Sequence, residues 1–133
     1  MRVADLMHTD VKTVFADSTV AEAIVTLADA HVSGVPVVDA HGRLVGVLSS
    51  SDVIQAEAEA SDKESRVAVL EETRTEDLMN PRPITVTSDT DLREAARQML
   101  YADVKRLFVE HEGKLVGVIS QSDIVGAVAG GKI

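Results

Sequence analysis

The sequence of 133 residues lacks cysteine and tryptophan, and it contains only one tyrosine and two phenylalanines. The absence of cysteine excludes disulfide bonds, thiolate chemistry and cysteine-based zinc sites. The scarcity of aromatic side chains argues against recognition of single-stranded nucleic acid by base stacking. The sequence also has no apolar run of membrane-spanning length and no apolar signal core behind Met1. We therefore expect a cytoplasmic protein that does not enter a membrane.

Positive charge is also scarce, with 13 Lys and Arg residues against 22 Asp and Glu residues and a net charge of -9. A field of this sign repels phosphate backbones, so we expect no nucleic-acid partner. It also opposes a nucleotide ligand, so a phosphate site would need a few local Lys or Arg side chains and helix N-termini. Apolar residues make up 45% of the chain, which is enough for an aliphatic core.

The main feature that is present is an internal repeat. The segment Gly42–Ile54 returns as Gly113–Val125, a shift of 71 positions. Nearer the start, Asp5–Met7 matches Asp77–Met79 at a shift of 72. This difference predicts that one residue has been gained or lost around Phe15–Asp17.

The repeat divides the chain into a first repeat at 1–60, a helical or solvated linker at 61–75 and a second repeat at 76–133. Each repeat is predicted to have the order β-α-β-β-α. Such a unit is too small to bury its own apolar face comfortably. We therefore predict an α+β (α/β) fold in which the two repeats pack with pseudo-twofold symmetry and form two related clefts.

Residue patterns place the elements within each repeat. The first helix is expected to begin with a capping box, because Thr19 and Glu22 have the spacing that lets each bond the other's backbone amide. Its buried face is predicted from helical apolar spacing at Ala21, Ile24, Val25 and Ala28, and in the second copy at Leu92, Ala95, Ala96 and Met99. The predicted strands are 13–15, 35–39 and 44–48 in the first repeat, and 84–86, 106–110 and 115–119 in the second.

Three motifs then carry a resemblance to a known family. They are the Asp5–Met7 opening with its partner Asp77–Pro81, the Ser33–Asp39 strand, and the Gly-h-h-Ser-x-x-Asp segments Gly46–Asp52 and Gly117–Asp123 (h, apolar). On these residues the chain resembles a tandem pair of CBS domains, often called a Bateman module, over essentially its whole length.

The resemblance implies a regulatory module rather than an enzyme. Such modules bind adenosine-containing ligands such as AMP, ADP, ATP, S-adenosylmethionine or NAD, and they require no cofactor. They commonly dimerise, and they transmit ligand occupancy to a regulated protein partner. For this chain the resemblance implies a homodimer.

The resemblance also implies that Ser49, Asp52, Ser120 and Asp123 line the ligand clefts. Their chemistry fits this role. An aspartate accepts charge-assisted hydrogen bonds from a ribose diol, and a helix N-terminus favours the binding of a phosphate. The same Ser-x-x-Asp spacing is also that of a helix N-cap followed by an acidic first turn. The two roles can coexist.

The remaining candidates lie on the strands. By resemblance, Thr13, Val14, Thr85 and Val86 hold the adenine, and Val35 and Pro36 form the other wall. The alternative for the valines is an ordinary core position.

Arg106 is the candidate phosphate ligand, because a guanidinium can engage phosphate oxygens bidentately. It is favoured over Lys105 because its place next to Leu107 lies closer to the expected cleft, although such an exposed charge pair can also be plain solvated surface. The second copy lacks the family proline at Leu107 or Phe108, and its hairpin is one residue shorter under one alignment. The second pocket is therefore expected to differ from the first.

Two other function classes can be weighed against this interpretation. A CBS-pair scaffold without a ligand, acting by dimerisation or by docking a partner, stays open as the alternative. Enzyme activity finds no support, because the sequence has no nucleophile elbow, metal-ligand cluster or glycine-rich cofactor loop. The histidines are interpreted as surface or loop residues and no metal site is expected: they are His8, His31, His41 and His111.

Overall fold

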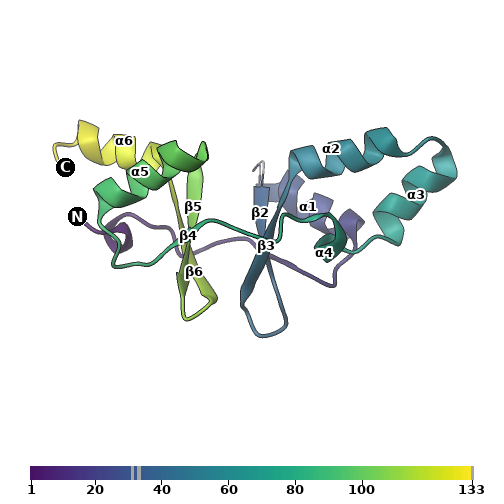
Figure 1. Ribbon diagram of the computed structural model, residues 1–133, viewed down its shortest axis with the longest axis horizontal. Helices are drawn as coiled ribbons and strands as arrows, with labels where there is room; N and C mark the ends of the chain where they lie inside the picture. The colour runs from purple at the N-terminus through teal and green to yellow at the C-terminus, as the bar shows by residue number, and fades with distance from the viewer. Residues whose placement is uncertain (31, 33, 133) are drawn as a thin grey trace. The chain divides into compact units, whose positions relative to one another are not determined.

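The computed structural model describes residues 1–30, 32 and 34–132. His31 and Ser33, which belong to features named above, lie outside the described residues. The chain forms two compact units (Figure 1). One is Lys12–Pro83, and the other combines Met1–Val11 with the chain from Ile84 onward. Each unit is described below by itself.

The Lys12–Pro83 unit contains a three-stranded sheet in the order β1-β2-β3. Strand β1 is parallel to β2, and β2 is antiparallel to β3. The helix α3 belongs to the predicted linker and contacts both α1 and α2. The elements are β1 (Val14–Phe15), α1 (Val20–Ala30), β2 (Gly34–Val38), β3 (Leu44–Ser49), α2 (Ser50–Glu59), α3 (Lys63–Glu71) and α4 (Thr75–Leu78).

The other unit repeats this plan, with a sheet in the order β4-β5-β6. Strand β4 is parallel to β5, and β5 is antiparallel to β6. Its elements are η1 (Val3–Asp5), β4 (Thr85–Val86), α5 (Leu92–Ala102), β5 (Arg106–His111), β6 (Lys114–Ser120) and α6 (Gln121–Ala129). The predicted α+β class and the β-α-β-β-α order of each repeat are confirmed.

Each unit has its own aliphatic core between its sheet and its helices. Alternate strand residues face this core, because successive side chains point to opposite faces of a sheet. In the Lys12–Pro83 unit the fully buried members of the core are Ala23, Val35, Val37 and Leu48. In the other unit they include Val3, Leu92, Ala95, Met99, Leu107, Val109 and Ile119.

The predicted buried face was only partly right for α1, where Ala21 and Ile24 are half-buried, and largely right for α5. In α1 the buried residues are Val20, Ala23 and Leu27, whereas Val25 is 58% exposed and Ala28 is also exposed. The physical reason is that α1 carries apolar residues around most of its circumference, so spacing alone permits more than one buried stripe. In α5 the predicted Leu92, Ala95 and Met99 are buried, and Ala96 is half-buried.

Strand registers place the one-residue difference between the repeats in the first hairpin, so the prediction around residues 15–17 was wrong. Gly34 pairs with Ser49, and Arg106 pairs with Ser120. The shift of 72 therefore persists from the opening segment through β2 and β5, and it becomes 71 on β3 and β6. The predicted place was too early in the chain because the first helices of the two repeats were matched at a shift of 71 instead of 72.

The two hairpin turns show the same difference directly. The second turn consists of Glu112 and Gly113, with φ angles of 53° and 83°. Two such residues give the tight turn that matches the twist of antiparallel strands. The first hairpin instead closes around residues 40–42. The backbone N–H of Asp39 donates to the C=O of Arg43, with N and O 3.0 Å apart. The second hairpin is thus the shorter one.

The opening segment of each repeat packs with the unit built by the other repeat. Val3 is fully buried in the core beneath β4–β6. His8 pairs with Val118 of β6 through two backbone hydrogen bonds of 2.9 Å. Asn80 pairs in the same way with Val47 of β3, at 3.0 and 2.9 Å. The compact units therefore cross the predicted boundaries at 1–60 and 76–133, because each opening segment extends the sheet edge of the other repeat.

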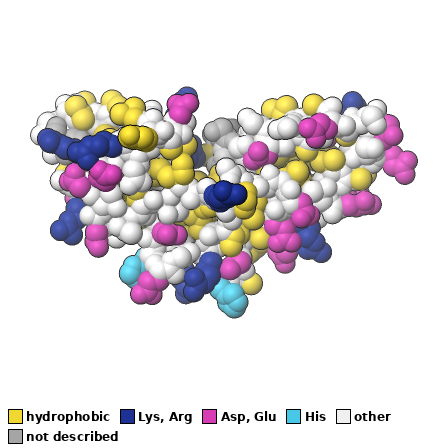
Figure 2. Space-filling model, viewed as in Figure 1, with side chains coloured by type: hydrophobic (Ala, Val, Ile, Leu, Met, Phe, Trp, Pro, Cys, Tyr) yellow, Lys and Arg dark blue, Asp and Glu magenta, His cyan; other side chains and the backbone are white. Residues whose placement is uncertain are grey.

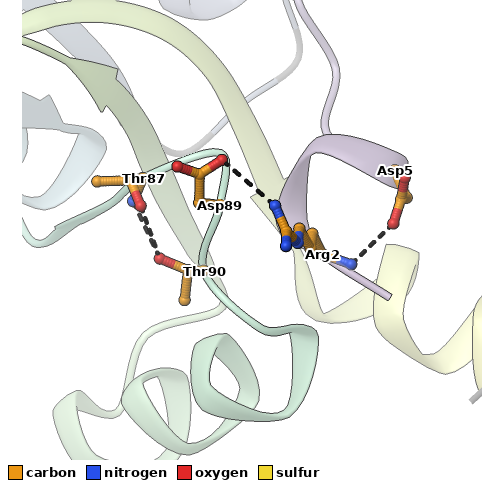
Figure 3. Close-up of polar contacts among 5 residues, drawn as sticks. All are labelled: Arg2, Asp5, Thr87, Asp89 and Thr90. Atoms are coloured by element: carbon orange, nitrogen blue, oxygen red, sulfur yellow. Dashed lines mark hydrogen bonds and ion pairs between the residues drawn. The ribbon is translucent and has the colours of Figure 1, made fainter.

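Polar contacts also hold the first opening segment in place (Figure 3). The backbone N–H of Arg2 donates to Asp5 Oδ2 at 2.8 Å. The Arg2 guanidinium lies 3.8 Å from Asp89 Oδ1, on a loop where the hydroxyls of Thr87 and Thr90 are 3.1 Å apart. These groups are largely exposed, so their contribution to stability is small compared with burial of the apolar residues.

Candidate functional site

The candidate site in the first repeat is the junction of β3 and α2. The backbone N–H of Asp52 donates to Ser49 Oγ at 3.2 Å, and the backbone N–H of Ser49 donates to Asp52 Oδ2 at 2.9 Å. This reciprocal pair is the capping box expected from the sequence. The cap uses Asp52 Oδ2 and leaves Oδ1 as the oxygen with which a ligand can interact.

The second repeat has the same arrangement at the junction of β6 and α6. The backbone N–H of Asp123 donates to Ser120 Oγ at 3.2 Å, and the backbone N–H of Ser120 donates to Asp123 Oδ2 at 2.8 Å. Both junctions therefore hold a carboxylate rigidly at a helix N-terminus, where the helix dipole favours negative charge.

The second junction has one additional partner, His8. Its Nε2 lies 2.8 Å from Asp123 Oδ1, and the two side chains are 65% and 18% exposed respectively. Burial raises the pKa of Asp123, but the hydrogen bonds from His8 and Ser120 outweigh burial and hold that pKa below its usual range. Because an ionised carboxylate only accepts hydrogen bonds, the His8 Nε2–H is the donor.

Sequence reasoning missed this role of His8 and treated the residue as plain surface. Asn80 holds the equivalent place in the other unit, and its Oδ1 instead accepts the backbone N–H of Arg82 at 3.0 Å. The signal available in the sequence was the shift of 72, which aligns His8 with Asn80.

The predicted strand residues fall on both faces of their sheets. Val14, Val35 and Val86 belong to the two cores. Pro36 is buried on the face opposite to Val35, because it follows Val35 in β2. Thr13 is exposed and lies just before β1.

In the second repeat the structure brings several predicted residues onto one face. Arg106 pairs with Ser120, and Thr85 pairs with Phe108. Because Arg106 and Phe108 are two residues apart in β5, all four side chains lie on the sheet face opposite to the core. Arg106 is half-buried, whereas Lys105 is exposed. A cation, two hydroxyls and the Asp123 carboxylate thus gather at one end of this sheet.

Neither metal chemistry nor a membrane span is visible in the described part of the chain. Across residues 1–30, 32 and 34–132, no group of three or more His, Cys, Asp or Glu side chains could hold a metal ion. Of the helices described, none has the length and apolar character needed to span a bilayer.

A family model described as the CBS domain matches residues 3–59 and 76–130. The structure of CBSX2 in complex with AMP superimposes with a TM-score of 0.83, at 31% identity over 99% of this chain and 98% of that chain.

Two sequence relatives differ in their overall size. CBSX1 of Arabidopsis thaliana, a CBS domain-containing chloroplastic protein, is 28% identical over 89% of this chain. The inosine-5'-monophosphate dehydrogenase of Methanocaldococcus jannaschii is 35% identical over 87% of this chain. The chain spans 59% of the length of the former and 21% of the latter.

Proposed function

The chain belongs to the CBS domain family, and on that premise we propose that it is a regulatory module that binds an adenosine-containing nucleotide. The observation that carries this proposal is the Ser-Asp cap at the start of α2 and again at the start of α6. In each, one carboxylate oxygen is fixed by the cap and the other is the acceptor for a ribose hydroxyl. The AMP complex of CBSX2, at 31% identity, supports an adenosine ligand.

Arg106 extends the proposal to a phosphorylated ligand. Its side chain shares a sheet face with Ser120, and Ser120 caps the helix that carries Asp123. A guanidinium near a helix N-terminus can neutralise a phosphate against the acidic field of the whole chain. Gly34 occupies the equivalent strand position in the first repeat, so we propose that only the second repeat reads phosphate in this way. The expected cleft between the repeats stays a prediction.

Thermal unfolding tests the proposal directly. The purified protein is heated with AMP, ADP, ATP, NAD, S-adenosylmethionine, cyclic dinucleotides or adenosine, each with and without magnesium. A ligand at 100 times its Kd should stabilise the folded protein by about 2.7 kcal/mol and raise its melting temperature. If no compound moves the melting temperature, the ligand-binding proposal is overturned and the scaffold alternative gains weight.

The scaffold alternative, in which the chain acts by dimerisation or partner docking, has its own supporting observation. Large apolar side chains are exposed on two adjacent helices, at Leu100 (76%) and Tyr101 (95%) of α5 and at Val125 (65%) and Val128 (57%) of α6. Figure 2 shows apolar side chains gathered over this helix pair. Burial of such side chains favours association, and we propose a homodimer through them. Sedimentation analysis of wild type and Tyr101→Ala tests it: a monomeric wild type excludes the homodimer.

The same proposal assigns no catalysis to the chain itself. In the dehydrogenase relative, the matched region is a small part of a longer enzyme, which fits a module that regulates a separate activity. We therefore propose a regulated protein as partner. Turnover of ATP by the purified chain would contradict the assignment as a non-enzyme.

A further inference from the structure

The two oxygens of the Asp123 carboxylate have different partners. Oδ2 accepts the backbone N–H of Ser120 at 2.8 Å, as part of the helix cap. Oδ1, the oxygen left for a ligand, already accepts a hydrogen bond from His8 Nε2 at 2.8 Å. A carboxylate oxygen has two acceptor sites, and at Oδ1 the imidazole already occupies one of the two that a ribose hydroxyl could use.

The backbone of His8 is fixed while its ring is accessible. Two hydrogen bonds of 2.9 Å tie the His8 N–H and C=O to Val118 of β6. The ring itself is 65% exposed. Rotation about the side-chain bonds can thus remove the imidazole from Asp123 and leave the sheet pairing intact.

Within the part of the chain that the structure describes, the first repeat shows no such competitor. Asn80 takes the place of His8 beside Val47, with the same backbone pairing. Its short side chain turns back to accept the backbone N–H of Arg82. The two repeats therefore present the same capped aspartate with different neighbours.

We propose that His8 is a built-in competitor for the ligand at Asp123, so that the second repeat binds adenosine nucleotides more weakly than its own groups would allow. This inference rests on the proposed function, since it takes Asp123 Oδ1 as the acceptor of the ribose hydroxyl. The ligand releases His8 when it binds, and occupancy of the second repeat is thereby coupled to the orientation of the His8 ring. The coupling is an intramolecular contact with two discrete states, which is what a regulatory module needs.

Calorimetric titration with AMP tests the inference in the Asp52→Ala variant, in which binding at the first repeat is weakened. Replacement of His8 by Asn, the residue type found at the equivalent place beside β3, should tighten AMP binding by about tenfold, the scale of a lost hydrogen bond to a charged group. His111→Asn is the matched control, because His111 lies in the same unit, is 74% exposed and contacts Glu112 rather than the site. It should leave the affinity unchanged.

The outcomes separate this inference from the proposed function. Unchanged or weaker AMP binding by the His8→Asn variant, with Asp123→Ala still binding AMP through the first repeat, overturns the role of His8 and leaves the proposed function standing. No binding of AMP or of any other compound in the thermal-unfolding panel, by wild type or any variant, overturns both. A second measurement follows the ring nitrogens of His8 by NMR: AMP should shift them in wild type and leave those of His111 in place, and unmoved His8 resonances at saturation contradict the competition.

Discussion

Gly117 lies directly beneath Met7, so that a Cβ added to Gly117 would come 2.9 Å from Met7 Sδ and 3.0 Å from the carbonyl oxygen of His8. Gly46 stands in the same relation to Met79, and a Cβ there would lie 2.7 Å from the carbonyl oxygen of Asn80. These glycines open the two Gly-h-h-Ser-x-x-Asp segments. Their role is to give space, because a side chain would push the opening segment off the sheet edge.

We predict that Gly117→Ala destabilises the protein by about 1–3 kcal/mol, the usual cost of an extra carbon in a packed site. Urea denaturation followed by circular dichroism measures the change. The nearest neighbours include backbone as well as the flexible end of Met7, so relaxation of the methionine alone is insufficient.

Gly126→Ala is the matched control for this substitution. Gly126 lies within α6, and a Cβ there meets nothing within 4 Å. Alanine should stabilise the helix by about 0.5–1 kcal/mol, because glycine is the poorer helix former. Equal stability of Gly117→Ala and wild type would show that the opening segment does not lie against β6 in solution.

Because each opening segment packs with the sheet of the other repeat, a second prediction follows. Val3 is fully buried in the core of the unit that contains β4–β6. Val3→Ala should destabilise the protein by about 2 kcal/mol through the cavity that it leaves. Hydrogen exchange should show the larger loss of protection at residues 84–132, far from Val3 in the sequence. A larger loss at residues 12–83 would contradict this packing.

The repeat, the element order and the helix caps were predictable from sequence, whereas the buried face of α1 was not. Caps and turns depend on residues three or four apart, so a duplicated pattern identifies them twice. In α1 the apolar pattern continues from the buried stripe through half-buried Ala21 and Ile24 to exposed Val25, and only the packing against the sheet selects Ala23 and Leu27. In α5 the charged residues mark the solvent face, and the prediction there was largely right.

The contact between His8 and Asp123 had no local signal, because the two residues are 115 positions apart. The contact forms because the opening segment joins the sheet of the second repeat. A first repeat predicted as residues 1–60 instead assigns that segment to the first sheet. Segments adjacent in sequence usually pack together, whereas Met1–Val11 belongs to the same compact unit as the chain from Ile84 onward. Sequence similarity between Asp5–Met7 and Asp77–Met79 showed equivalence of the segments without showing where each lies.

If AMP binds, Asp52→Ala or Asp123→Ala should weaken it by about 1.5–3 kcal/mol, the range for a hydrogen bond to a charged group. Each substitution also removes part of a helix cap, so stability should fall by about 1 kcal/mol. Calorimetry below the melting temperature separates the two effects.

Asp62→Ala controls for the loss of a cap alone. Asp62 caps α3 through a hydrogen bond of 2.7 Å from the backbone N–H of Ser65, and it is not among the candidate site residues. This variant should lose similar stability and keep its AMP affinity. Full AMP affinity in both Asp52→Ala and Asp123→Ala would exclude the proposed ribose contacts.

Arg106→Ala should weaken AMP more than adenosine, because the guanidinium is proposed to contact the phosphate and not the nucleoside. The expected difference is about tenfold in Kd, the scale of one charge-assisted hydrogen bond. Arg97→Ala is a suitable control, since Arg97 is exposed on α5 and pairs with Glu94 at 2.6 Å. An equal loss for AMP and adenosine would show that Arg106 does not read the phosphate.

The lowered pKa of Asp123 predicts how stability depends on pH. Because the folded protein holds this carboxylate ionised more strongly than the unfolded chain does, its stabilising contribution is complete above the unfolded pKa of about 3.9. It is lost as the pH falls through the lower, folded-state pKa. His8→Asn removes one of the hydrogen bonds that lower this pKa, so the pKa of Asp123 should rise and acid unfolding should begin at higher pH.

Carboxyl carbon NMR can follow that titration residue by residue. Asp39 is the internal control: its pKa is lowered mainly by the backbone N–H of Arg43, with His41 adding to the effect, and His8 takes no part. The Asp39 titration should therefore be the same in wild type and in His8→Asn. If the pKa of Asp123 is also the same in both, His8 does not donate to the carboxylate in solution. In that case both the competition at Oδ1 and the asymmetry between the two repeats lose their structural basis.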